Sequence, residues 1–97
     1  MTTLVELVAK NKQKPFIVCD VSPPRGGSTQ LLEGIADVTP DMFFVAANPG
    51  RTVRASSSAV AQWIESNTKI PALFAMTTRD MNKTAMQTTL LGAHVMG

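Results

Sequence analysis

The fold of this chain is restricted most by three short apolar segments. Each of them is followed by a turn and then by a helix-like pattern. They read FIVCDVS (residues 16–22), DMFFVAA (41–47) and ALFAMTT (72–78). Their apolar residues are largely consecutive, which is typical of strands covered on both faces, and Val, Ile and Phe favour extended backbone. Strands of this kind separated by helices predict an α/β fold with a parallel sheet and right-handed crossovers.

The segments around the predicted strands have helical periodicity. Before the first strand, Leu4, Leu7 and Val8 share one helical face, and Pro15 ends that helix. The residues expected to face inward from the later helices are Leu31, Leu32, Ile35 and Ala36, then Val60, Trp63 and Ile64, and finally Met81, Ala85, Met86, Leu90 and Ala93.

Capping residues predict where the three later helices begin. Ser28 is the candidate N-cap of TQLLEGIADV, Ser56 or Ser57 of SAVAQWIESNT, and Asp80 of MNKTAMQTTLLGAHVMG. The expected order is a helix followed by three βα units with parallel strands. A chain of 97 residues is within the size of one domain.

Composition and charge exclude several classes of protein. Of the 97 residues, 44% are hydrophobic and 16% are charged, and the formal net charge is +2. The basic residues form no stripe with stacking aromatics, and no apolar run approaches the roughly 20 residues that span a bilayer. We therefore expect neither a nucleic acid nor a membrane as partner. The single cysteine forbids an internal disulfide, no Cys/His cluster predicts a metal site, and the expected location is the cytoplasm.

Unusual residues gather after the three strands, in DVSPPRGG, AANPGRTVR and MTTRDMN. In parallel α/β folds this edge of the sheet carries function. Asp20 and its neighbour Cys19 should point to opposite faces, with Cys19 toward the helices. A carboxylate buried among apolar residues holds its proton to higher pH, as a general acid requires. The residues alone leave open a structural Asp20, bonded to loop amides or paired with Arg25 or Arg79.

The turn PPRGG and the loop arginines are weaker signals. Backbone amides before a helix, together with Arg25, are able to bind an anion, but the lysine of a Walker motif is absent and an ordinary turn is favoured. Arg51 and Arg54 in the second loop are candidates to meet a carboxylate or phosphate, and solvated side chains are favoured. The serines and threonines have no paired base, so a Ser/His/Asp triad is not predicted.

Three segments of the chain together resemble the methylenetetrahydrofolate reductase family. They read VCDVSPPRGG, VAANPGRTVRASSSAVAQWI and MTTRDMNKTAMQTTLLGAHVMG. Relatives carry an acid and two prolines after the first strand, commonly as Glu-x-x-Pro-Pro-Arg/Lys. They also carry an Asn-Pro or similar turn followed by an Arg and a Ser/Leu-rich helix. The last segment is similar to the Thr-Cys-Arg-Asp-Arg-Asn and Leu-Leu-Gly-Ala block of the bacterial branch. The motifs occur in family order over nearly the whole chain.

The resemblance implies a fold, an activity and site residues. Family members are (βα)8 TIM barrels that use FAD to reduce methylene-tetrahydrofolate to methyl-tetrahydrofolate, so a folate substrate is implied. The acid of the first strand is implicated as the general acid that helps to open the five-membered ring of the folate, and this role falls on Asp20. The cofactor-binding positions fall on Ala46, Ala47, Pro49 and Ala75.

Several residues depart from the family pattern. Asp20 is one methylene shorter than the usual glutamate, and a displacement of about 1 Å is able to lower a rate roughly hundredfold. Ala46 and Ala47 stand where relatives often have Thr or Asp, and Ala75 where some have His. These alanines offer backbone or van der Waals contacts. Three βα units do not close a barrel.

Residues 1–97 are therefore expected to be a single incomplete barrel segment: a truncated product, an excised fragment, or a remnant completed by another chain. The segment alone should be inactive and should associate with itself or with the missing barrel segment. The alternative function is a non-catalytic remnant or partner subunit. The bare sheet face is expected to carry Val18, Phe44, Ala46, Leu73 and Ala75, with Asp20 among them.

Overall fold

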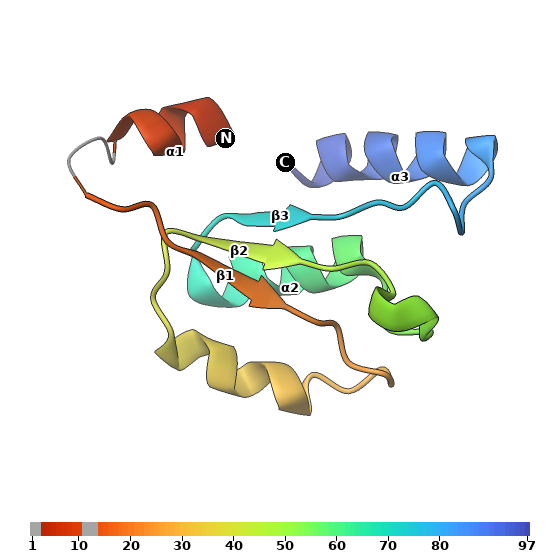
Figure 1. Cartoon of the computed structure of the whole chain (residues 1–97), viewed down its shortest axis with the longest axis horizontal. Helices are drawn as coiled ribbons and strands as arrows, with labels where there is room; N and C mark the ends of the chain where they lie inside the picture. The colour runs from red at the N-terminus through yellow and green to blue at the C-terminus, as the bar shows by residue number, and fades with distance from the viewer. Residues whose placement is uncertain (1–2, 11–13) are drawn as a thin grey trace.

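The computed structural model describes residues 3–10 and 14–97, which form one small sheet and the helices around it (Figure 1). In chain order the elements are α1 (Leu4–Lys10), β1 (Val18–Val21), the 3₁₀ helix η1 (Gln30–Asp37), β2 (Met42–Val45), the short 3₁₀ turn η2 (Pro49–Arg51), α2 (Ser57–Thr68), β3 (Ala72–Phe74) and α3 (Lys83–Met96). This is the predicted order of a helix and three βα units, with η1 as the helix of the first unit.

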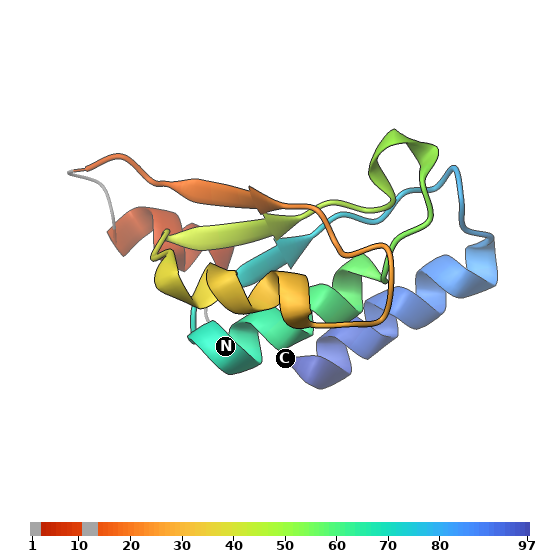
Figure 2. The ribbon, with the colours of Figure 1, turned by 90° about the horizontal axis from the view of Figure 1, so that it is seen from below.

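The sheet is parallel, and its strands lie in the order β1–β2–β3. Strands that are neighbours in sequence are therefore neighbours in space, as in a (βα)8 barrel. The helices η1, α2 and α3 lie on the same face of the sheet (Figure 2). The prediction of a partial (βα)8 barrel with an N-terminal helix and three parallel βα units is confirmed.

The hydrophobic core lies between the sheet and these helices. β2 contributes Phe43 and Val45, and α2 contributes Ile64; all three side chains are 0% exposed. Leu32 of η1 belongs to the same cluster. Cys19 of β1 packs against it, which confirms that this side chain faces the helices.

The opposite face of the sheet is bare over much of its area. Val18 and Leu73 are 44% and 43% exposed, and Phe44 between them is half-buried. Met42 on the same face is buried, and it shares a hollow with Leu7 of α1 at the amino-terminal end of the strands. The first helix therefore lies at one end of this face, where a helix at a barrel bottom is expected, but a hollow separates it from the strands and the remainder of the face is open.

The caps of the first two later helices differ in outcome. The predicted cap Ser28 is wrong by one residue, because Thr29 is the N-cap of η1; the hydroxyl of Ser28 still accepts a hydrogen bond from the amide of Gln30 at 3.1 Å. Ser56 precedes α2 as its N-cap, but its hydroxyl lies 2.9 Å from that of Ser58 rather than on a backbone amide. The predicted inward residues Leu32, Ile35, Val60, Trp63 and Ile64 are buried or half-buried, whereas the side chains of Leu31 and Ala36 lie outside the described part.

The last helix differs from the prediction at two residues. Asn82, not Asp80, is the N-cap of α3, and its side chain accepts a hydrogen bond from the amide of Ala85 at 2.8 Å. Asp80 is instead bonded to Arg79, so the predicted cap is wrong. Leu90 was expected to face inward and is 56% exposed, because α3 contacts α2 over only a short part of its length.

Candidate functional site

The loops that follow the three strands meet at the carboxyl-terminal edge of the sheet (Figure 1). The hydroxyl of Ser57, at the start of α2, donates to the carbonyl of Ala75 at the end of β3, at 2.7 Å. Arg54, in the second loop, donates to the carbonyl of Pro23 in the first loop, at 2.8 Å. The three loops therefore form one connected surface at the edge where parallel α/β folds carry function.

Asp20 lies at this edge and belongs to the bare face of the sheet. It pairs in register with Phe44, and Phe44 pairs with Leu73, so the three side chains form a row across the strands. The side chain of Asp20 is exposed. The expectation of a buried carboxylate is therefore wrong, because no residue of the described chain covers the bare face at this point.

The arginines considered as partners of Asp20 lie elsewhere. Arg79 forms a two-bond pair with Asp80, Nη2 to Oδ2 at 2.7 Å and Nε to Oδ1 at 3.0 Å. This hydrogen-bonded pairing lowers the pKa of Asp80 and raises that of Arg79. Arg25 is exposed. Within residues 3–10 and 14–97 no hydrogen bond or ion pair joins the carboxylate of Asp20 to another residue, so the structural alternative finds no support there.

A groove of about 300 Å³ opens between the second and third loops. Ala47 and Ala75 line it together with Thr77, so two of the four predicted cofactor positions belong to the same groove. Ala46 and Pro49 are half-buried nearby but do not line the groove. Across the part of the chain that the structure describes, no group of three or more His, Cys, Asp or Glu side chains is placed to hold a metal ion.

Sequence reasoning missed one polar residue that lines this groove, Asn48, and assigned another, Arg54, to solvent. Asn48 has a left-handed backbone, with φ 42°, and its side chain accepts a hydrogen bond from the amide of Arg54 at 3.0 Å. The NPG turn was the available signal, because Asn tolerates this conformation. Arg54 is half-buried and bonded to the first loop, so the expectation that it is solvated is wrong; Arg51 is exposed, as expected.

The comparisons with known proteins classify this arrangement. Comparison with the curated proteins and with the solved structures gave no match. The family of methylenetetrahydrofolate reductase matches residues 5–97. The chain belongs to the methylenetetrahydrofolate reductase family. Methylenetetrahydrofolate reductases are TIM barrels, so β1, β2 and β3 correspond to consecutive barrel strands and the bare face to the barrel interior. Asp20 therefore lies at the mouth of that interior.

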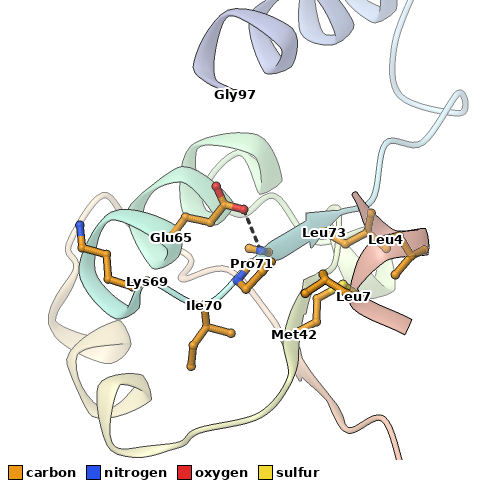
Figure 3. A pocket seen from close by; sticks show the side chains of 10 residues that line it. Leu4, Leu7, Met42, Glu65, Lys69, Ile70, Pro71, Leu73 and Gly97 are labelled. Carbon is orange, nitrogen blue, oxygen red and sulfur yellow. Dashed lines mark hydrogen bonds between the residues drawn. The ribbon is translucent and has the colours of Figure 1, made fainter. Parts of the chain in front are cut away.

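A larger hollow, of about 460 Å³, lies at the opposite edge of the sheet (Figure 3). Leu4 and Leu7 of α1 line it with Met42 of β2. Beside them the carboxylate of Glu65 accepts a hydrogen bond from the amide of Ala72 at 2.9 Å. In TIM barrels the amino-terminal face serves stability and the carboxyl-terminal face serves chemistry. We therefore assign the larger hollow to packing and the smaller groove to the candidate site.

The described part of the chain contains no helix that is long and apolar enough to cross a membrane.

Proposed function

We propose that this chain contributes the first three βα units of a flavin-dependent methylenetetrahydrofolate reductase of the bacterial branch, which reduces methylene-tetrahydrofolate to methyl-tetrahydrofolate. The observation that carries the proposal is the family match over residues 5–97, combined with Asp20 at the carboxyl-terminal end of β1 on the bare face. The TTRDMN segment supports the bacterial branch.

Asp20 is proposed as the general acid. Its carboxyl group would donate a proton to the ring nitrogen of the folate as the five-membered ring opens, and the resulting iminium carbon is the position that is reduced. A general acid has to hold its proton near neutrality, which requires a covered, apolar surrounding. A folate seated on Phe44 and Leu73, in the same row as Asp20, would supply that cover.

The residues of the candidate site fit one part of FAD. Small-molecule sites measure about 300–1,000 Å³, and the groove is at the lower end of that range, so it accommodates a ring system rather than a whole dinucleotide. Ala47 and Ala75 line the groove with small apolar side chains that a flat ring would be able to approach closely, and polar residues such as Asn48 and Thr77 complete the lining. FAD bound there would supply the hydride. Its other contacts would come from further barrel strands.

A reductase assay with the longest natural form of the protein tests this proposal. With FAD and a reductant, we expect it to reduce methylene-tetrahydrofolate, and Asp20→Asn to lower kcat by about 10²–10⁴-fold, the usual contribution of a general acid. Asp37→Asn is the matched control, because Asp37 is an exposed acid at the end of η1. A natural form that binds no flavin and reduces no folate would overturn the proposal.

A non-catalytic partner subunit is the second candidate, and the exposed surface favours it. The chain exposes 6640 Å², whereas a compact monomer of 10.4 kDa exposes about 5,400 Å². The excess is larger than the roughly 800 Å² that each partner contributes to a standard interface. We propose that the bare face, with Val18 and Leu73, is covered by a second copy or by further barrel strands.

Sedimentation of the 97-residue chain at low micromolar concentration tests the association. We expect species larger than a monomer, and Leu73→Ser, which places a hydroxyl on the bare face, should shift them toward monomer. Leu91→Ser on α3 is the control, because Leu91 is 69% exposed and lies on a helix outside the sheet. A folded monomer that does not associate would contradict this assignment.

A further inference from the structure

The loop after β1 is bound to the loop after β2 by two short hydrogen bonds. Nη1 of Arg54 donates to the carbonyl of Pro23 at 2.8 Å, and the amide of Ala55 donates to the carbonyl of Pro24, also at 2.8 Å. We call these two bonds the loop clamp. The residues that they join are 31 positions apart in the chain, so the clamp is a tertiary feature rather than a local turn.

The diproline turn makes an outside donor necessary. Pro23 and Pro24 are buried, so each of their carbonyls needs a hydrogen-bond donor. Arg54 and Ala55 supply them. The guanidinium of Arg54 lies deep enough that its Nε is buried without a hydrogen-bond partner in the described chain. A buried, unpaired N–H is unfavourable, so packing between the loops and the bond to Pro23 hold this side chain in place.

The backbone of the second loop is itself fixed in the orientation that the clamp requires. The side chain of Asn48 accepts the amide of Arg54 at 3.0 Å, and Asn48 has the left-handed backbone that turns the chain at this point. Asn48 therefore sets the direction in which the Arg54 side chain leaves the loop. The contacts run from Asn48 through Arg54 to Pro23.

Asp20 depends on this backbone for its position. In the described chain its carboxylate has no hydrogen bond or ion pair, so among the described residues its direction follows from the backbone. Asp20 and Val21 are held by strand pairing with Phe44 and Val45, and the carbonyl of Val21 accepts the amide of Ala46 at 3.0 Å. The next fixed point is Pro23, which the loop clamp holds.

We infer that Arg54 is a positioning residue for Asp20: by holding the diproline turn against the second loop, it fixes the end of β1 and with it the direction of the carboxylate. The catalytic meaning of this inference rests on the proposed reductase function. The effect on the position of Asp20 does not, and it is measurable without any substrate.

Hydrogen exchange and NMR on the whole 97-residue chain test the inference. Arg54→Met removes the donor and keeps the length of the side chain, whereas Arg54→Lys retains a charged donor. Arg51→Met is the matched control, because it removes the same charge from the same loop at an exposed position. The readouts are the exchange rate of the Ala55 amide and the carboxyl ¹³C resonance of Asp20.

We expect Arg54→Met to accelerate exchange at Ala55 by about tenfold or more, since a hydrogen bond from a charged group is lost, and to move the Asp20 resonance. Arg54→Lys should restore both readouts in part, and Arg51→Met should change neither. The amide of Val45, in the core strand β2, reports global opening, so its rate measures how much of the change at Ala55 is a loss of global stability. Unchanged Ala55 and Asp20 signals in Arg54→Met, or equal changes in Arg51→Met, would overturn the inference.

If Arg54→Met does not fold, Arg54→Lys is compared with Arg51→Lys instead. Faster exchange at the Ala55 amide is then expected in Arg54→Lys and not in Arg51→Lys. In the reductase assay, Arg54→Met should lower kcat with little change in KM, because the acid is displaced while the substrate surface is kept. Absence of reductase activity in the unmodified protein would refute the proposed function and leave the exchange and NMR result to decide the role of Arg54.

Discussion

Phe43 and Phe44 are neighbours on β2 whose side chains lie on opposite faces of the sheet, so truncating each one measures what covers its face. Phe43 is 0% exposed and packs with Ile64 of α2. Phe43→Ala should lose the transfer free energy of the ring and leave a cavity, at about 3–5 kcal/mol. Phe44 is half-buried and opens to solvent in the monomer, so at concentrations too low for association Phe44→Ala should cost about 1 kcal/mol, half of the burial value of the ring with no cavity.

Urea unfolding followed by the fluorescence of Trp63, which packs against the core, measures the difference. For a slope near 1 kcal/mol per M, the two midpoints should differ by about 2 M or more. Ile64→Val, at about 0.5–1.5 kcal/mol, serves if Phe43→Ala does not fold. Equal losses for Phe43 and Phe44 would show that the bare face is covered as well as the helix face. A cost at Phe44 that rises with protein concentration would indicate cover by a second copy.

Three further changes are expected to have small, signed effects. Gly50→Ala should lower the free energy of unfolding by about 1 kcal/mol, because the φ angle of Gly50 is 68°. Gly92→Ala in α3 should raise it by about 0.5–1 kcal/mol, because an added Cβ meets no atom within 4 Å. Urea midpoints of the two variants that move in the same direction would refute this. Asn82→Ala should cost about 1 kcal/mol and lower the helical circular dichroism signal. Because Arg79 lowers the pKa of Asp80, this pair stabilises the fold above the unfolded-state pKa of Asp80, near 4, and the stabilisation is lost as pH falls through the lowered pKa. Arg79→Met should therefore raise the titration midpoint of Asp80 measured by NMR. An unchanged midpoint would contradict the pairing.

The strands and their order were predictable because one physical pattern specifies them. Consecutive apolar residues in β2 require cover on both faces, and period-two alternation then separates Cys19, on the helix face, from Asp20, on the bare face. Both assignments depend on local sequence only. The same holds for the loops at the carboxyl-terminal edge, since parallel strands end on the same side.

The features that escaped prediction depend on residues far apart in the chain. Whether Asp20 is buried is decided by what lies over the sheet, and no local pattern contains that information. The bond from Arg54 to Pro23 joins positions 31 apart, and a loop arginine has no sequence signal for such a partner. Asp80 and Asn82 are both good caps two positions apart, and the pairing of Asp80 with its neighbouring arginine leaves Asn82 to cap α3.

The hydrogen bond between Glu65 and Ala72 bears on how the sheet is able to grow. The amide of Ala75 donates to Val45 of β2, so by alternation of the strand backbone the amide of Ala72 points to the free edge of β3. A strand that adds in parallel needs this amide as a donor, and the Glu65 carboxylate already occupies it. Glu65 therefore competes for this amide with any strand that adds to the edge of β3, and such addition is the first step of edge-to-edge aggregation. A fourth barrel strand that takes this amide has to displace the carboxylate, so growth of the sheet is an exchange of partners rather than the filling of an empty edge.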